Sequence, residues 1–139
     1  MIRKINIQNE SELKKVFSVM KQLRPHLNFE VFSSSIKEQV NQLYELWVYE
    51  LDSQCIGAMG MREYTDFVRG RHLYIDDLVV DEAHRSKKIG ALLLHFAEEE
   101  MKKRKLPSLR LSCAIENVGG MKFYEKEKWV KRSVVYIKK

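Results

Sequence analysis

The stretch VVDEAHRSKKIGALLL, residues 79–94, constrains the fold most, because an apolar strand leads through a short basic segment directly into a helix. The helical part carries apolar residues that recur three and four positions apart: Ile89, Leu92, Leu93, Phe96, Ala97 and Met101. The first N–H groups of a helix have no partner within it, and the helix dipole is positive there. Such a junction favours an anion, and above all a phosphate.

Three cations and a glycine strengthen this prediction. Arg85, Lys87 and Lys88 place positive charge ahead of the helix, and Gly90 lies in its first turn. A glycine within a helix costs about 1 kcal/mol relative to alanine, so the close approach of a ligand to the backbone would explain it. A lysine-rich surface loop before a core helix is the alternative. The sequence favours a phosphate cradle and leaves that alternative open.

Strand-like alternation and helical spacing divide the rest of the chain. Strands are predicted at Ile2–Ile7, Tyr44–Leu51, Gln54–Tyr64, Arg71–Val80 and Ser108–Ala114, with a final strand or hairpin arm at Trp129–Ile137. Helices are predicted at Glu10–Leu23, Phe29–Leu43 and Val118–Lys128, besides the one that starts near Ile89 and is stopped by Pro107. The order β-α-α-β-β-β-α-β-α-β predicts an α+β fold (an α/β mixed sheet) with helices packed on a single sheet, in one domain over residues 1–139.

Composition excludes several classes of protein. Hydrophobic residues make up 45% of the 139 residues and charged residues 32%, which is typical of a globular domain. No apolar run is long enough to span a bilayer, and the N-terminus alternates rather than forming a secretory signal, so we expect a cytoplasmic protein without membrane contact. Cys55 and Cys113 are expected to be reduced, buried thiols, and no spacing of His, Cys and Asp predicts a metal site.

Two segments together resemble one known family. The run YIDDLVVDEAHRSKKIGALLL resembles the signature of the GNAT superfamily of acetyl-CoA-dependent N-acetyltransferases, with Arg85 and Gly90 in the outer positions of its Arg/Gln-x-x-Gly-x-Gly/Ala pattern. Lys88 stands where the middle glycine is usual. The run SCAIENVGGMKFYEKEKWV resembles the family's strand–Asn–helix segment through Asn117 and the pair Phe-Tyr that ends at Tyr124. Lys128 again replaces a usual glycine there. The resemblance covers nearly the whole chain in element order.

The resemblance implies where acetyl-CoA would bind, with no metal required. Its pyrophosphate would lie on the backbone amides from Arg85 to Ala91, which are those of Arg85, Ser86, Lys87, Lys88, Ile89, Gly90 and Ala91. Its pantetheine arm would pair like an added strand with the main chain of Leu78, Val79 and Val80, with the amide of Leu78 or a neighbour facing the thioester carbonyl. Asn117 would contact the arm near its sulfur end, besides capping the last helix.

Acetyl transfer to an amine requires a base for the ammonium proton and benefits from an acid for the leaving thiolate. Strict alternation would place Tyr74, Asp76, Leu78 and Val80 on one face and Asp77 on the other. If Leu78 borders the thioester, Asp76 is therefore the candidate base, directly or through a water. By resemblance Tyr124 is the acid. The alternatives are that Asp76 and Asp77 only cap a strand or pair with the basic loop, and that Tyr124 is a core aromatic. Cys113 is expected in the core rather than as a nucleophile, which agrees with direct transfer.

The amine acceptor, a small molecule or a peptide, is the least constrained part. The resemblance places its pocket between residues 23–35 and residues 63–71, where the candidate side chains are Arg24, His26, Glu30, Tyr64 and Arg69. A non-catalytic acyl-CoA-binding regulatory module of the same fold is the main alternative. The net charge of +6 also suggests nucleic-acid binding as a third hypothesis. No aromatic-basic stacking motif or helix-turn-helix accompanies the basic segments, so no nucleic-acid partner is expected. Dimers are common among relatives, which leaves a homodimer open.

Overall fold

The computed structural model describes residues 1–139 and contains one five-stranded sheet in the order β1-β2-β3-β4-β5. The strands are β1 (Ile2–Lys4), β2 (Tyr44–Leu51), β3 (Gln54–Asp66), β4 (Gly70–Val80) and β5 (Leu109–Leu111). The helices are α1 (Glu10–Leu23), α2 (Phe29–Val40), α3 (Ile89–Lys103) and α4 (Val118–Lys126), with a short 3-10 turn η1 (Glu82–His84) after β4. The first four strands pair antiparallel, and β4 pairs parallel with β5. This mixed sheet confirms the predicted α+β class.

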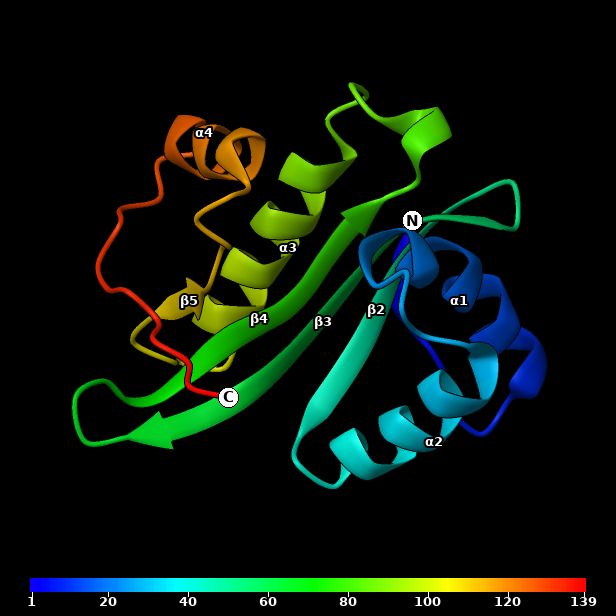
Figure 1. Ribbon diagram of the computed structural model, residues 1–139, viewed down its shortest axis with the longest axis horizontal. Coiled ribbons are helices and arrows are strands. Elements are labelled where there is room, and N and C mark those ends of the chain that lie inside the picture. Colours follow the sequence, from blue (N-terminus) through cyan, green and yellow to red (C-terminus); the bar gives the residue numbers. More distant parts are fainter.

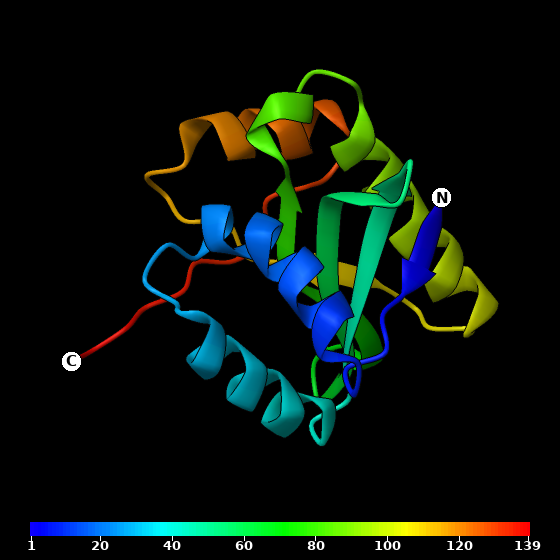
Figure 2. The same cartoon turned by 90° about the vertical axis from the view of Figure 1, so that its right-hand side faces the viewer.

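Helices cover both faces of the sheet (Figure 1). We call the face under α1 and α2 the front and the face under α3 the back; Figure 2 shows the sheet standing between these two layers. Each face has its own apolar core. The front core joins the buried sides of α1 and α2, such as Leu13 and Ile36, to Leu46 and Ala58 of the sheet. The back core packs Leu93 of α3 on the sheet together with its neighbours.

Asparagine caps explain where three of the helices begin. The side chains of Asn9, Asn28 and Asn117 accept hydrogen bonds from main-chain N–H groups in the first turns of α1, α2 and α4. Such a cap satisfies one of the N–H groups that a helix start leaves without a partner. The predicted start of each of these helices is confirmed, and so is the capping role of Asn117. Helix α3 differs, because its N-cap residue Lys88 makes no side-chain hydrogen bond.

A β-bulge in β4 corrects the predicted alternation of side chains. The pairing of β3 with β4 shifts register between Gly60 and Met61, so that Gly60 lies opposite Asp77 while Met61 lies opposite Ile75. Asp76 is therefore the extra residue. Leu73, Ile75, Leu78 and Val80 all pack on the back core, whereas Val79 belongs to the front core. The prediction that Asp76 shares a face with Leu78 and Val80 is wrong, because the bulge reverses the alternation at that point.

Two other predictions about strands need correction. The final strand predicted at Trp129–Ile137 is wrong, since residues 130–139 form neither strand nor helix. The strand predicted at Ser108–Ala114 is real but spans only Leu109–Leu111. The hairpin between β2 and β3 is confirmed, and its turn residues Asp52 and Ser53 have φ of 51° and 63°, as a tight hairpin turn requires. None of the helices combines the length and the hydropathy that a membrane span requires.

Candidate functional site

The edge of β4 that faces β5 is open from Asp76 onward. The two strands pair only at three positions, the last being Ile75 with Leu111. Beyond the bulge, the N–H of Asp81 donates to Ile56 in β3. Because main-chain groups alternate between the two edges of a strand, Val79 faces β3 as Asp81 does. Leu78 and Val80 therefore direct their N–H and C=O groups to the open edge, where no strand pairs with them. The carbonyl of Val80 accepts a hydrogen bond of 3.3 Å from Nε of Arg85.

The start of α3 lies just beyond this open edge. Its first backbone hydrogen bond runs from the N–H of Leu92 to the carbonyl of Lys88, so the N–H groups of Ile89, Gly90 and Ala91 precede it without an intrahelical partner. Lys88 adopts a left-handed backbone conformation with φ of 62°, and Ser86 one with φ of 71°. Side chains from Arg85 to Lys88 are exposed. The loop therefore presents free donors and positive charge at one point, which suits a phosphate.

Gly90 has a packing role that the sequence did not predict. A Cβ atom on Gly90 would lie 3.2 Å from Cζ of Phe123 in α4 and 3.8 Å from a methyl group of Val80. The glycine therefore lets α4 approach the start of α3. Phe123 in turn packs against Tyr124, with their ring centroids 5.3 Å apart and their planes tilted by 57°. The absence of a side chain at Gly90 thus sets the place of Tyr124 relative to the α3 amides.

Tyr124 lies half-buried on the back-core side of α4. Its ring contacts that of Trp129 edge-on at 6.1 Å, and its carbonyl accepts a hydrogen bond from the N–H of Trp129. Burial raises the pKa of Tyr124 to about 12, and the neighbouring Cys113 acts in the same direction. The side chain is therefore a neutral phenol at neutral pH, with a proton to donate. Lys128, which connects α4 to Trp129, has φ of 71°, a value that glycine adopts more readily.

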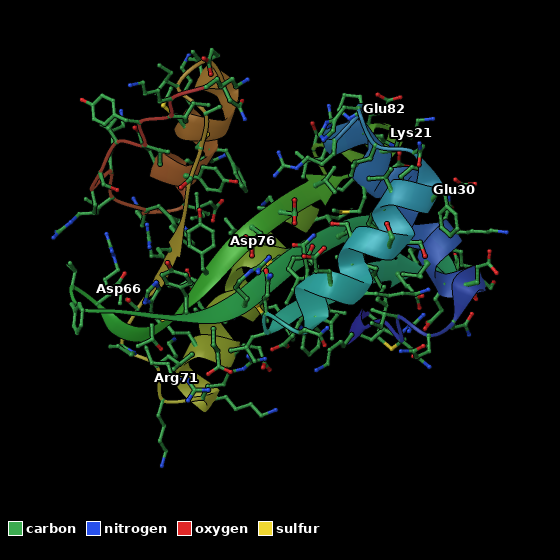
Figure 3. All side chains as sticks on the ribbon, turned by 60° about the horizontal axis from the view of Figure 1, so that its bottom comes forward. Lys21, Glu30, Asp66, Arg71, Asp76 and Glu82 are labelled. Carbon is green, nitrogen blue, oxygen red and sulfur yellow. The ribbon has the colours of Figure 1, made fainter.

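Asp76 projects onto the front of the sheet, and Figure 3 shows it between α2 on one side and α4 with the terminal segment on the other. Its Oδ2 accepts a hydrogen bond of 2.8 Å from Nε of Arg62, whose Nη2 donates to Gln39 of α2 at 2.7 Å. Its Oδ1 accepts none, and the side chain keeps 26% of its surface exposed. Burial raises the pKa of Asp76 above its usual range, although Arg62 opposes this effect. A half-buried carboxylate with one free oxygen and a raised pKa can accept a proton.

Asp77 lies on the same face but is fully engaged in holding the fold. Its Oδ2 accepts from the hydroxyl of Tyr44 at 2.8 Å, and its Oδ1 accepts from Arg24 at the end of α1. Gly60 permits this arrangement, because a Cβ there would overlap the Tyr44 phenol. The bulge thus places two successive carboxylates on the front with different roles: Asp77 ties β2 and α1 to β4, whereas Asp76 keeps an oxygen free.

Of the remaining candidates from the sequence, only Arg24 reaches this point, where it donates to Asp77 and to the carbonyl of Asp76. Tyr64 and Arg69 lie near the β3–β4 hairpin at the far end of the sheet, where Arg69 pairs with Asp66, and Figure 3 shows Asp66 and Glu30 on opposite sides of Asp76. Both His26 and Glu30 are exposed.

Sequence reasoning did not single out Arg62, Tyr44 or Gln39. The only signal in the chain was Gly60 in the middle of an apolar strand, which is typical of a bulge or a close approach. Of the two cysteines, Cys55 is buried as predicted, whereas Cys113 is only half-buried; both are free. The described chain holds no cluster of three or more His, Cys, Asp or Glu side chains arranged to hold a metal ion.

Comparison with known proteins settles the family. The model of the acetyltransferase (GNAT) family matches residues 12–128. The chain belongs to the GNAT acetyltransferase family. The uncharacterized N-acetyltransferase YhdJ of Bacillus subtilis (strain 168) is 26% identical over 125 residues, covering 89% of this chain and 88% of that protein.

Solved structures agree with this membership. Glucosamine-6-phosphate N-acetyltransferase from Arabidopsis thaliana is 25% identical, with a TM-score of 0.77 and coverage of 100% of this chain and 97% of that chain. The aminoglycoside N-acetyltransferase AAC(6')-Iy, solved in complex with CoA, is 16% identical and shares the fold with a TM-score of 0.85, over 100% of this chain and 93% of that chain. As a GNAT enzyme, the protein is an N-acetyltransferase that transfers an acetyl group to an amine acceptor.

The residues at the end of β4 fit the donor that GNAT enzymes use. Acetyl-CoA carries phosphates, an arm with two amides and a thioester. Free N–H groups at the start of α3 and cations from Arg85 to Lys88 suit the phosphates. The open edge of β4 at Leu78 and Val80 suits amides that pair as a strand does.

Proposed function

We propose that the end of β4 and the start of α3 form the acetyl-CoA site, and that acetyl transfer occurs beside the bulge in β4. One observation carries this proposal: an unpaired strand edge and an uncapped helix start meet within the same short segment. Amides from Arg85 to Ala91 hold the pyrophosphate, the main chain of Leu78 and Val80 pairs with the arm, and Asn117 contacts its sulfur end. Val79 does not pair with the arm, because its main-chain N–H and C=O groups face β3.

When bound, acetyl-CoA supplies an acetyl group activated as a thioester. We assign the base to Asp76, whose free Oδ1 takes a proton from the attacking amine, directly or through a water. The N–H of Leu78 donates to the thioester carbonyl oxygen as negative charge develops there. The phenol of Tyr124 gives its proton to the departing sulfur. The new C–N bond thus forms as the C–S bond breaks, and one proton moves at each end.

Arg62 serves as a positioning residue for this base. Its guanidinium holds one oxygen of Asp76 and is itself held by Gln39 of α2, so the carboxylate is fixed in direction with its second oxygen free. Side chains held by packing and further hydrogen bonds are what keep a catalytic geometry within narrow limits.

The acceptor is proposed to be a primary amine on a small molecule or a peptide, entering over the front of the sheet between α2 and the terminal segment. One relative is named for an amino sugar phosphate and another for aminoglycosides, and both substrates are small molecules that carry amines. We also propose that residues 1–139 act as one domain, and that the enzyme acts in the cytoplasm without nucleic-acid or membrane partners.

A second function deserves a direct test. Lys88 and Lys128 stand where relatives usually carry glycine, and both have left-handed backbone conformations. This observation favours, as an alternative, a non-catalytic module that binds acyl-CoA. Affinity for acetyl-CoA without turnover would support that alternative.

Release of free CoA in the presence of a panel of primary amines separates the two functions. We expect amine-dependent release with at least one amine. Tyr124→Phe should slow turnover by about 100-fold to 10,000-fold, since a general acid commonly contributes that range. It should leave the affinity for acetyl-CoA nearly unchanged. Tyr49→Phe, in β2 where that strand pairs with β1, is the matched control and should be neutral. A large loss of affinity with normal turnover in Tyr124→Phe would contradict the assignment.

A further inference from the structure

Arg110 in β5 carries a guanidinium group that makes no hydrogen bond within the protein. Leu109 and Leu111 on either side of it pack on the back core, so Arg110 points to the front. Only 28% of its side chain is exposed, yet the nearest carboxylate oxygen, Oδ2 of Asp66, is 3.9 Å away. That oxygen already accepts a hydrogen bond of 3.0 Å from Arg69, and Oδ1 of Asp66 accepts from main-chain N–H groups of the β3–β4 turn. The N–H groups of Arg110 are therefore free for a ligand.

Two arginines that are similarly buried use their donors within the fold. Arg62, with 15% of its side chain exposed, donates to Asp76. Arg104, with 19% exposed, donates to Glu45 and Glu100. A guanidinium presents five N–H donors in a plane that matches a carboxylate or a phosphate, and burial of such donors without an acceptor costs free energy. A mostly buried guanidinium whose donors are unused therefore indicates an anionic ligand.

Arg110 lies close to the proposed base. The strand register pairs Arg62 with Tyr74 and Tyr74 with Arg110, so the three form one row across the sheet. The guanidinium carbon of Arg110 lies 5.0 Å from the centre of the Tyr74 ring. Asp76 follows two residues after Tyr74, at the proposed entrance between α2 and the terminal segment, residues 130–139 (Figure 3). Strand spacing and rise place the Cα atoms of Asp76 and Arg110 about 8 Å apart, which a small acceptor can span.

We propose that the amine acceptor also carries an anionic group, a carboxylate or a phosphate, and that Arg110 binds this group and thereby determines specificity. This inference rests on the proposed function, because it places the acceptor amine at Asp76. Ser112 offers a further donor, since its hydroxyl accepts from Tyr74 at 2.9 Å and keeps its own proton free. Because β5 runs parallel to β4, Ser112 follows Arg110 in the direction of Asp76.

The charges on the front favour such an acceptor over a polycation. Oδ1 of Asp76 is free for an ammonium group, and the guanidinium of Arg110 is free for an anion. A second ammonium group on the acceptor would meet Arg110 or Arg24, which donates to the carbonyl of Asp76, and like charges at close range weaken binding. The site therefore complements a molecule with one amine and one anion.

Calorimetric titration with matched pairs of amines, in the presence of excess CoA, tests this proposal. The pairs are γ-aminobutyrate with butylamine, serine with serinamide, and phosphoethanolamine with ethanolamine, so that they separate a carboxylate from a phosphate. We expect the anionic member of at least one pair to bind about 10-fold to 100-fold more tightly, as hydrogen bonds to a charged group provide. Arg110→Gln should remove this difference. Arg3→Gln, which removes the same charge from β1 at the opposite edge of the sheet, is the matched control and should keep it.

Equal affinities within every pair would overturn the proposal. A difference that Arg110→Gln leaves intact would also overturn it, because the positive charge of the whole protein would then be the cause. Circular dichroism checks that Arg110→Gln folds, which is expected because it removes no hydrogen bond.

A measurement on the unsubstituted protein tests the contact without any variant. The NMR signal of the Arg110 Nε–H group should shift with the anionic amines and stay in place with the neutral ones; a signal that no amine moves would contradict the contact. Release of CoA from acetyl-CoA is measured separately. Its absence with every amine would refute the proposed acetyl transfer, whereas the binding results alone decide the role of Arg110.

Discussion

Replacing Gly90 by alanine tests whether Phe123 of α4 packs closely on the start of α3. Alanine is favoured over glycine within a helix by about 1 kcal/mol. Against that gain, the new Cβ would lie 3.2 Å from Cζ of Phe123, a contact that forces the ring to move by a few tenths of an ångström. Overpacking of this kind typically costs about 1–3 kcal/mol. We therefore expect Gly90→Ala to lower the free energy of unfolding by up to about 2 kcal/mol, or at best to leave it unchanged.

Gly119→Ala is the matched control, since a Cβ on Gly119 in α4 meets nothing within 4 Å. It should raise the free energy of unfolding by up to about 1 kcal/mol. Urea unfolding of both variants gives the comparison, and Gly90→Ala in a Phe123→Leu background should recover the helical gain. If Gly90→Ala stabilises the protein as much as Gly119→Ala does, close packing of α4 on α3 does not explain this glycine.

Three further predictions concern the bulge, the base and the cysteines. Tyr44→Phe should lower the free energy of unfolding by about 1–3 kcal/mol, because it leaves a partly buried oxygen of Asp77 without its donor. Tyr64→Phe should have no effect, and equal effects of the two variants in urea unfolding would refute the role given to Asp77. The acid limb of the pH profile of kcat/KM should report the protonation of Asp76. Since Arg62 lowers the pKa of this carboxyl, Arg62→Gln should move the limb to higher pH, and Asp76→Asn should abolish it. A limb that neither variant changes would exclude Asp76 as the base. Iodoacetamide at pH 8 should alkylate Cys113 well before Cys55, because Cys55 is buried and burial raises its pKa to about 11. Peptide mass mapping over time measures the order of alkylation, and early labelling of Cys55 would contradict its burial.

Elements that depend on local patterns could be predicted from the sequence. Helix α1 and strand β2 begin and end at the predicted residues, because caps, apolar spacing and a tight turn are local signals. The junction from β4 to α3 was likewise predictable, since it depends on a helix start that follows a strand directly.

Features that depend on contacts between distant segments could not be predicted. The bulge at Asp76 is set by pairing with Gly60, and it reverses the faces of every residue after it in β4. For the same reason Arg62, which holds Asp76 across two strands, had no signal of its own. The terminal segment has a strand's composition, but a strand also needs a partner edge, and the single chain does not bring one to it.

The central proposal is that main-chain N–H groups at the end of β4 and the start of α3 bind the acetyl donor. Two-dimensional NMR of the ¹⁵N-labelled protein titrated with CoA measures those groups directly. The largest shifts should fall on Leu78, Val80 and the amides from Ser86 to Ala91, while those at the β3–β4 hairpin stay in place. An unchanged spectrum, or shifts centred away from these amides, would contradict the site.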